Sequence, residues 1–350
     1  MKWVKNKQFW GALIGIALLV FCLRDLNLDD ISQLWYRLNF VYFGSAVACS
    51  FFFIILRGLR WKIILNKQAK VKTGRTVLLY SAGQVLNIVM PALTGQVGRL
   101  ILFARKQGLR KTFVFSTIIL EIVFDAVSLI LFILVTSLVA AFPEEYQDIS
   151  YIVAGATLFA VILLYLILHF RENLEALGHR RLRDRSPGVY ITIKKFLRSF
   201  TKGIELLKSS QHVVLSMIVS LASWTFHMLA LYFLFLSFGF DESIPVAAAI
   251  MIINTIILMI PITPGNAGTF EIAVSRALLL LSTTGIVRSD AVLYALALHI
   301  LDLIPILVLG MTFLHFERMS LTQLKREHEK DIILSKINED GNYVEEEEQV

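Results

Sequence analysis

The chain has 350 residues, of which 56% are hydrophobic and only 17% are charged, and its mean hydropathy is +0.68. Soluble domains carry nearer a quarter of charged residues, so this composition excludes a string of soluble domains. A helix of about 20 apolar residues crosses a bilayer core. Four uncharged stretches reach or approach that length: 38–56, 149–170, 211–240 and 243–270. We therefore predict an all-α polytopic membrane protein.

The net charge of +7 conceals an uneven distribution. From Glu317 onward the chain has 5 basic and 10 acidic residues, which leaves 29 basic and 17 acidic residues before it. Such an excess in a membrane protein is typical of cytoplasmic loops and of contact with anionic lipid, not of nucleic-acid binding. We predict a transmembrane domain over 1–316 and a charged cytoplasmic tail over 317–350. Cys22 and Cys49 each lie in an apolar run and imply no disulfide framework.

Three lysines among the first seven residues predict a cytoplasmic N-terminus, followed by an uncleaved helix over about 9–23. The acid-bearing loop 24–39 is then expected outside the cell. A second helix, over about 39–56, returns the chain to the cytoplasm. The next segment, 57–75, has seven basic residues and no acid, which is a strong cytoplasmic signal.

The segment 76–95 breaks the simple alternation of spans. It is apolar enough to cross, yet both of its flanks are basic and it is interrupted by polar residues, Gly and Pro. A hairpin that enters the membrane and returns to the same side satisfies both facts. Such non-helical backbone is tolerated only where protein or a wet cavity covers it. We predict a re-entrant hairpin here.

Beyond this hairpin, spans are predicted over about 113–141, 149–170, 211–240 and 291–316. The basic loop 171–210 should lie partly as a helix along the membrane surface. Between Asp241, expected outside, and Arg318, expected inside, an odd number of crossings is required. A second hairpin around the Pro/Gly-rich break near Pro261, entered from outside and followed by one span, supplies that number. The prediction is about six spans and two oppositely oriented re-entrant hairpins, in the inner membrane, with both termini cytoplasmic.

The two breaks align with each other. Residues 90–98 and 260–268 both read apolar-Pro-x-x-x-Gly-x-x-Gly. Chance recurrence of Pro and Gly in membrane helices is the alternative, but the shared context of helix, hairpin and helix favours an inverted repeat of 39–141 and 211–316. Inverted repeats with broken helices are a recurring transporter plan. Glycines permit positive φ, and a restarting helix presents free N–H groups to an anion. The residues of the breaks are Pro91, Gly95, Gly98, Pro261, Pro264, Gly265 and Gly268.

Several short motifs follow one another in a distinctive order: Arg57-Gly-Leu-Arg60-Trp61, Asn87-x-x-x-Pro91, Gly95-x-x-x-Arg99, Glu121-x-x-x-Asp125 and Pro264-Gly265-x-x-Gly268-x-x-Glu271. Together they resemble the membrane domain of the lysylphosphatidylglycerol synthetases, the flippase-like or UPF0104 family, over about residues 10–316. Gln96 and His299 depart from that pattern, which has a glutamate and an arginine there. These departures bear on the substrate more than on the fold.

The resemblance implies phospholipid translocation, or membrane partnership with a lipid-modifying enzyme. In the aminoacyl-lipid synthetases a large soluble catalytic domain follows the membrane part. The residues from 317 onward are too few for such a domain, so we do not expect a soluble aminoacyl-transfer domain here.

Charged residues within apolar helices cost about 2.5–3.5 kcal/mol each at the helix centre, so they are functional candidates. Glu121 and Asp125 are four residues apart and share a helix face. They predict either a proton relay or counter-charge to Arg99, or a structural ion pair with nearby arginines. Glu271 is expected to cap the helix that restarts after the second break. His299 and Asp302 are expected to orient one another or to hold a proton, whereas His227 reads as a packing residue.

The expected function is translocation of phospholipids or polyprenyl-linked lipids whose anionic or modified headgroups pass through a polar groove. Two other roles stay open: a non-catalytic membrane partner of a lipid- or glycan-modifying enzyme, and a lipid aminoacyl or glycosyl transferase. The sequence contains no nucleotide-binding loop or serine nucleophile elbow, and we expect no cofactor or metal. The candidate lipid-path or headgroup-binding residues are Arg57, Arg60, Asn87, Arg99, Glu121, Asp125, Glu271, His299 and Asp302.

Overall fold

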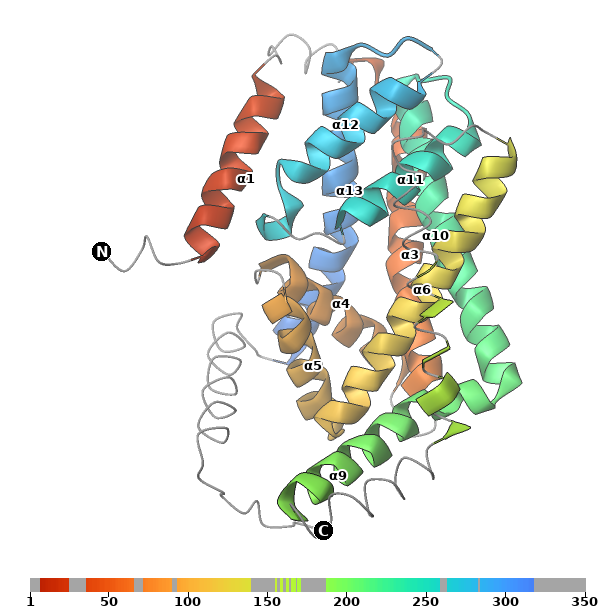
Figure 1. The fold of residues 1–350 in the computed structure, drawn as a ribbon. Helices are drawn as coiled ribbons and strands as arrows, with labels where there is room; N and C mark the ends of the chain where they lie inside the picture. Colours follow the sequence, from red (N-terminus) through yellow and green to blue (C-terminus); the bar gives the residue numbers. More distant parts are fainter. Residues whose placement is uncertain are drawn as a thin grey trace.

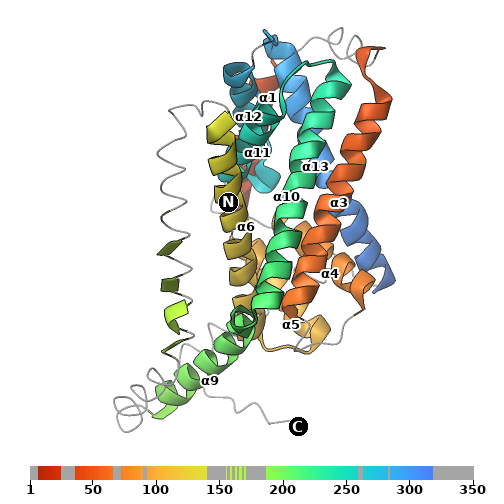
Figure 2. The same cartoon turned by 90° about the vertical axis from the view of Figure 1, so that its right-hand side faces the viewer.

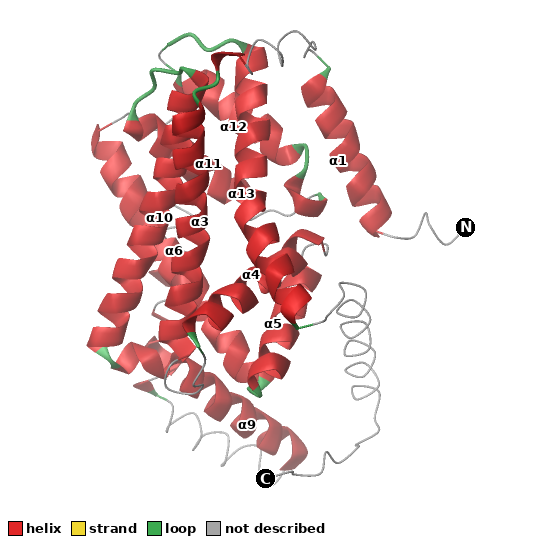
Figure 3. Ribbon diagram, turned by 180° about the vertical axis from the view of Figure 1, so that it is seen from behind, coloured by secondary structure: helices red, strands yellow, loops and turns green. Residues whose placement is uncertain are grey.

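The computed structural model describes residues 7–24, 36–65, 72–89, 93–139, 187–258, 263–282 and 284–317, with scattered positions in 155–170; for a few residues only the backbone is described. Within these ranges the regular elements are helices and no strand is present (Figure 3). The α-helices are α1 (Lys7–Leu23), α3 (Phe40–Leu65), α4 (Thr73–Val89), α5 (Leu93–Gln107), α6 (Lys111–Val139), α9 (Pro187–Ile204), α10 (Ser210–Phe238), α11 (Ile244–Leu258), α12 (Thr269–Leu281) and α13 (Arg288–Phe316). The predicted all-α class is confirmed.

Four helices in the described part of the chain are long and apolar enough to cross a membrane: α3, α6, α10 and α13. They run the full height of the molecule, and α3 packs along α10 (Figures 1 and 2). The first predicted helix is also present as the shorter α1. The expected span 149–170 falls mostly on residues outside those described, so the count of about six spans stays a prediction.

The second predicted helix does not end at Leu56, because α3 continues to Leu65. The reason is tertiary: Arg60 and Trp61 are fully buried, and Arg60 finds carboxylate partners inside the bundle. A charge that is neutralised by a neighbouring helix does not need to leave the helix for water. The first half of the basic segment 57–75 is thus helical and places Arg60 in the bundle interior, whereas the sequence predicted a loop.

Two pairs of short helices fill the space between the long ones. Helices α4, α5, α11 and α12 have 13 to 17 residues, so each is at most about 25 Å long, less than the roughly 30 Å of a bilayer core. Figure 1 shows α4 and α5 in one half of the molecule and α11 and α12 in the other. The pairs meet at mid-height, where a Cβ placed on Gly265 would lie 3.6 Å from Ile88 Cγ2.

The order of elements is the same in both halves: long, short, short, long, as α3–α6 and again as α10–α13. This matches the element pattern on which the repeat was predicted. The helix pair α4 and α5 is longer than the predicted segment 76–95, since α5 extends past Arg99 to Gln107.

The aligned glycines of the two breaks adopt different conformations. Gly265, in a short 3₁₀ turn with Pro264 (Pro264–Asn266), has φ 61°, and Gly268 has φ 83° at the N-terminus of α12. Gly95 and Gly98, by contrast, lie within α5, which begins before them. The freedom that glycine has to adopt positive φ is therefore used at the second break, whereas Gly98 is helical. Pro91 and Pro261 lie outside the described residues.

Helix α4 sits at the centre of the bundle because three glycines allow close approach around it. A Cβ on Gly58 of α3 would lie 2.9 Å from Val77 Cα, and one on Gly83 of α4 would lie 2.8 Å from Arg99 Cγ. A Cβ on Gly310 of α13 would lie 2.5 Å from Val85 Cγ2. Small residues at helix contacts are the usual device for packing membrane helices backbone to backbone. The position of α4 is thus set by shape.

Helix α9 crosses one end of the molecule (Figures 1 and 2). It buries Phe200 and Ile204 against α6 and leaves Ile193 and Phe196 exposed, with lysines beside them. The sequence placed an amphipathic helix here, and the helix itself is confirmed. Its location in the plane of the membrane interface stays a prediction.

Gly310→Ala will lower the thermal stability of the detergent-solubilised protein, because the new methyl group has no space between α13 and α4. Overpacking of a tight contact typically costs about 1–3 kcal/mol. Gly74→Ala is the matched control, since nothing lies within 4 Å of the Cβ it would add. Equal unfolding temperatures for the two variants would contradict the close contact.

At the end of α13, Glu317 accepts hydrogen bonds from Arg75 of α4 (2.6 Å) and Lys106 of α5 (2.8 Å). The bonds from Lys106 and Arg75 hold the pKa of the Glu317 carboxyl below its ordinary value of 4.5. A lowered pKa in the folded state stabilises it above the ordinary pKa, and the contribution disappears as pH falls through the folded value.

Glu317→Gln will therefore reduce stability at neutral pH by at most about 0.2–1 kcal/mol, since these ion pairs are accessible to water. The difference from the unsubstituted protein will shrink as the pH falls below 4.5, the ordinary carboxyl value. Thermal unfolding of both proteins over a pH series measures it. A difference that stays constant down to strongly acidic pH would show that the ion pairs do not stabilise the fold.

Candidate functional site

Three arginines and two carboxylates form a buried group that we call the arginine–carboxylate cluster: Arg57, Arg60, Arg99, Glu121 and Asp125. Asp125 receives Arg57 Nη2 at 2.5 Å and Arg60 Nη1 at 2.6 Å. Glu121 pairs directly with Arg99, and Arg57 Nη2 lies 3.6 Å from it. The two carboxylates share one face of α6, as their spacing predicts. The carboxylates are thus paired with nearby arginines, including the expected counter-charge to Arg99.

Further polar side chains hold the carboxylates in place. Trp224 Nε1 donates to Asp125 Oδ1 at 3.0 Å, and Arg60 Nη1 donates to Ser220 Oγ at 2.7 Å. Ser220 and Trp224 both come from α10 and belong to none of the short motifs in the sequence. The cluster therefore joins α3, α5, α6 and α10 in the interior.

A chain of hydrogen bonds leads from the cluster along α4. The Tyr80 hydroxyl donates to Glu121 at 2.7 Å, Gln84 Nε2 donates to the Tyr80 oxygen at 2.8 Å, and Asn87 Nδ2 donates to Gln84 Oε1 at 3.0 Å. The spacing of four and three residues places these side chains on one helix face. The candidate residue Asn87 is thus connected to the cluster through two residues that the motif analysis passed over.

The cluster has one more positive than negative charge. Several of its guanidinium nitrogens are buried and find no hydrogen-bond partner among the described residues: Nε of Arg57, Arg60 and Arg99, and Nη2 of Arg60. Buried donors without a partner are costly, more so when the group is charged. Guanidinium groups match the oxygens of phosphate and carboxylate groups. The arrangement is suited to a singly charged oxyanion.

A second group, the break cluster, lies at the second hairpin and contains Glu271, His299, Gly265 and Gly268. Glu271 Oε2 accepts the Gly268 N–H at 2.7 Å, which confirms its predicted capping role. Its other oxygen lies 2.7 Å from His299 Nδ1, and His299 Nε2 lies 3.0 Å from the Gly265 carbonyl. A carbonyl accepts only, so Nε2 carries a hydrogen, and one further proton is shared between Nδ1 and the carboxyl group.

The expected pairing of His299 with Asp302 is not what the structure shows. His299 pairs with Glu271, while Asp302 Oδ1 lies 3.7 Å from Nδ1 of His227. His227 does pack, stacking on Phe53 with ring centroids 4.5 Å apart, but its nitrogen also faces a carboxylate. The three-residue spacing places His299 and Asp302 on one face of α13. Each of them nevertheless meets a different neighbouring helix.

The candidate residues thus fall into two clusters and one separate pair. Among the described residues, no group of three or more His, Cys, Asp or Glu is placed to hold a metal ion. The short sequence motifs do not include Tyr80, Gln84, Ser220 and Trp224, although the helical spacing of Ser220 and Trp224 with His227 is a signal for the last two.

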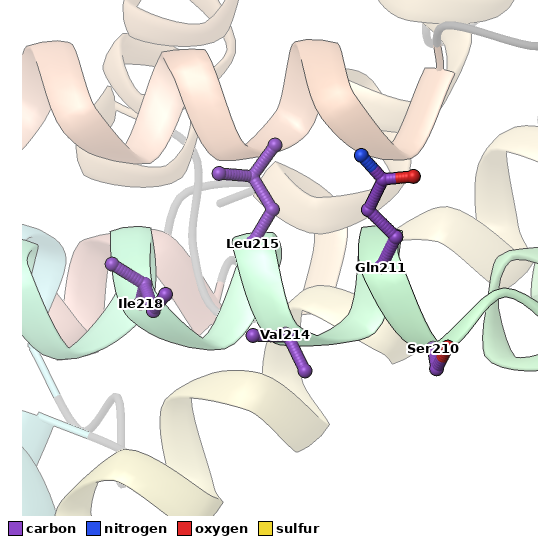
Figure 4. A pocket seen from close by; sticks show the side chains of 5 residues that line it. All are labelled: Ser210, Gln211, Val214, Leu215 and Ile218. Atoms are coloured by element: carbon purple, nitrogen blue, oxygen red, sulfur yellow. The ribbon is translucent and has the colours of Figure 1, made fainter.

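A shallow groove of about 400 Å³ lies on the outer face of α10, away from both clusters. Figure 4 shows the side chains that line it: Ser210, Gln211, Val214, Leu215 and Ile218. Val214, Leu215 and Ile218 are exposed apolar side chains. Such a face on a spanning helix is expected to contact lipid.

The chain is similar to known membrane proteins. The family model described as the lysylphosphatidylglycerol synthase TM region matches residues 8–310. The chain belongs to this family. The resemblance of the short motifs is thereby confirmed.

Curated relatives of the chain are archaeal UPF0104 membrane proteins. One from Methanothermobacter thermautotrophicus is 23% identical over 289 residues, covering 77% of this chain and 84% of the relative. One from Pyrococcus horikoshii is 21% identical over 300 residues, covering 78% and 87%. No solved structure matches the chain. The names of these relatives state that they are membrane proteins and state no activity.

Removing one partner of the Arg99–Glu121 pair will cost more than removing both. Glu121→Gln leaves Arg99 as a buried, uncompensated charge and is expected to destabilise the protein by about 3–5 kcal/mol. The double variant Glu121→Gln/Arg99→Gln removes that charge and will recover part of the loss. Thermal unfolding of the single and double variants in the same detergent measures the coupling. Additive effects would show that the two side chains do not form a functional ion pair.

Proposed function

We propose that this protein translocates phospholipids with anionic headgroups across the membrane. The headgroup would follow a polar path between the two hairpins while the acyl chains stay in the lipid. One observation carries the proposal: the arginine–carboxylate cluster has a net positive charge and buried guanidinium N–H groups without partners. A phosphodiester supplies one negative charge and the acceptor oxygens that these groups lack.

The polar chain along α4 supports a path beyond the cluster. It runs from Glu121 through Tyr80 and Gln84 to Asn87, close to the end of α4. The neighbouring residue Ile88 lies beside Gly265, whose carbonyl belongs to the break cluster. Hydrogen-bonding groups therefore follow one another from the first hairpin to the second. A headgroup moving between them would exchange one set of polar partners for the next.

The two pairs of short helices support the same proposal. Because α4 and α5 occupy one half of the molecule and α11 and α12 the other (Figure 1), we interpret them as re-entrant hairpins of opposite orientation. With α3, α6, α10 and α13 they would form an inverted repeat. In transporters of this plan, substrates bind near the midplane, where the broken helices meet.

The orientation that we propose follows from basic residues at one end of the bundle. Helix α3 ends near Lys62, α4 begins near Arg75, α5 ends at Arg105 and Lys106, and α6 begins at Lys111. All are on the side where α9 lies. Cytoplasmic loops carry such an excess of Lys and Arg. The arginine–carboxylate cluster would then be entered from the cytoplasmic leaflet, with both termini in the cytoplasm of the inner membrane.

The geometry favours translocation over transferase chemistry. A general base needs an unoccupied carboxylate within reach of its substrate. Both Glu121 and Asp125 are instead engaged by arginines. The family description refers to a synthase of a modified phospholipid, which is consistent with a phospholipid as substrate.

The test is reconstitution of the purified protein into vesicles that contain a fluorescent phosphatidylglycerol in one leaflet. The unsubstituted protein is expected to move the lipid to the other leaflet. Arg57→Gln removes the cluster arginine with the most accessible side chain, which is 20% exposed, and should slow transfer by about tenfold or more, equivalent to about 1.4 kcal/mol. Arg110→Gln, at an exposed arginine, is the matched control and should leave the rate unchanged.

Two results would overturn the proposal. One is the absence of lipid transfer by the folded, unsubstituted protein in vesicles of any headgroup composition. The other is an Arg57→Gln protein that is folded and as fast as the Arg110→Gln control. Co-purification of a lipid- or glycan-modifying enzyme in the first case would favour the partner role.

A further inference from the structure

A third polar site lies between α10, α11 and α13 and is used by neither cluster. His227 is 4% exposed and Asn254 is 1% exposed. His227 Nδ1, Asp302 Oδ1 and both amide atoms of Asn254 find no hydrogen-bond partner among the described residues. Buried polar atoms nearly always have a hydrogen-bond partner, so each buried group without one requires an explanation. Four such atoms at one place form a polar site whose hydrogen bonds are incomplete.

The distance between His227 and Asp302 indicates that the missing species is a proton. At 3.7 Å the nitrogen and the carboxyl oxygen are too far apart for a hydrogen bond but need only a small movement to form one. Without an added proton, the pair has a net charge of −1 in a mostly apolar interior. One added proton, on the carboxyl oxygen or on the imidazole, brings the pair to zero and supplies the missing donor. Burial therefore favours the form with one more proton.

The surroundings contain few charges to compensate Asp302. Helix α11 contributes only the neutral Asn254, which faces the carboxylate. On α13 itself, His299 and Tyr294 are the titratable neighbours, and the charge of His299 is matched by Glu271 of α12. From α3, Arg57 faces His227, but this arginine is already engaged by Asp125 of α6. On α4, the buried titratable group is Tyr80, which belongs to the arginine–carboxylate cluster.

Ring contacts connect this site to the arginine–carboxylate cluster. His227 stacks on Phe53, and the guanidinium carbon of Arg57 lies 5.2 Å from the centroid of the same ring. His227 also meets Trp224 edge to face at 5.9 Å, and Trp224 donates to Asp125. A charge on His227 therefore changes the electrostatic energy of Arg57, and a movement of the His227 ring displaces the side chains that contact Arg57 and Asp125. By linkage, an anion bound at Arg57 must in turn strengthen proton binding at the pair, to the same extent.

We propose that His227 and Asp302, with Asn254 beside them, form a proton-binding site whose occupancy is coupled to anion binding at Arg57. The side chain of Asp302 is 18% exposed, and the proposal requires that a proton reach it from the aqueous phase. No bond to carbon, oxygen or phosphorus breaks: a carboxylate becomes an acid, or an imidazole becomes an imidazolium, and the charge changes by one. If lipid translocation occurs, one proton would accompany each anionic headgroup. Only this proton-to-headgroup transport rests on the proposed function; the proton site and its coupling to anion binding do not.

The first measurement tests the site alone. The protein in nanodiscs of zwitterionic phosphatidylcholine is followed by infrared spectroscopy between about pH 5 and pH 8, where histidine and perturbed carboxyl groups change charge. We expect the carbonyl band of a protonated, buried carboxylic acid, or the matching imidazolium signal, to titrate in this range. Asp302→Asn should abolish it. Asp241→Asn, the same change at an exposed aspartate, is the control and should leave it intact.

A second variant guards against loss of folding. His227→Phe keeps an aromatic ring against Phe53 while removing the nitrogen, so it should preserve the stack and shift or remove the titration. A folded protein without any titrating group in this range would overturn the proposal. So would a titration that survives both Asp302→Asn and His227→Phe.

The second measurement tests the coupling. When phosphatidylcholine is replaced by phosphatidylglycerol, a pH indicator in weakly buffered solution should report uptake of about one proton per chain. The uptake should be lost in Asp302→Asn and in Arg57→Gln, but not in Asp241→Asn. Titration in phosphatidylcholine without this uptake would keep the proton site and overturn its coupling. Uptake without lipid transfer in vesicles would keep both and reject only the proposed function.

Discussion

The fold depends on the neutralisation of charges that lie inside an apolar bundle. Glu121 and Asp125 of α6 bind three arginines that come from α3 and α5. A single buried charge in a membrane is costly, but a partner with good geometry offsets much of that cost. Because the partners belong to different helices, each ion pair also fixes how those helices lie against one another. The same constraint explains why α3 continues through Arg57 and Arg60 to Leu65.

Close helix packing at three glycines adds to the effect of the buried ion pairs. Gly58, Gly83 and Gly310 allow the backbones of α3, α5 and α13 to approach α4 closely. This brings Tyr80 of α4 into contact with Glu121, and Gln84 bonds Tyr80 in turn, so a line of polar side chains runs within an otherwise apolar bundle. Helix packing without a hydrophobic driving force depends on such close contacts. A hairpin that is too short to span the bilayer is thus held in place by glycines and by one hydrogen-bonded face.

The three polar sites lie along one connected region. In the break cluster, His299 is the basic partner of one oxygen of Glu271, while the other oxygen caps α12. Between the two clusters, the His227–Asp302 pair is joined to Arg57 by Phe53 and to Asp125 by Trp224. These contacts are the basis of the proposed coupling between an anion and a proton bound in this region.

The sequence by itself determined the membrane class, the helices, the two breaks and most of the charged residues of the site, because hydropathy, charge and Pro/Gly positions act locally. It also predicted the Glu271 cap, a contact within three residues. Only the tertiary structure decided which partners the charges have. Spacing within one helix states which residues share a face, as for His299 and Asp302, but not which helix that face meets. The pairing of Asp302 with His227, the extension of α3 and the helical Gly98 all follow from contacts between segments far apart in the chain.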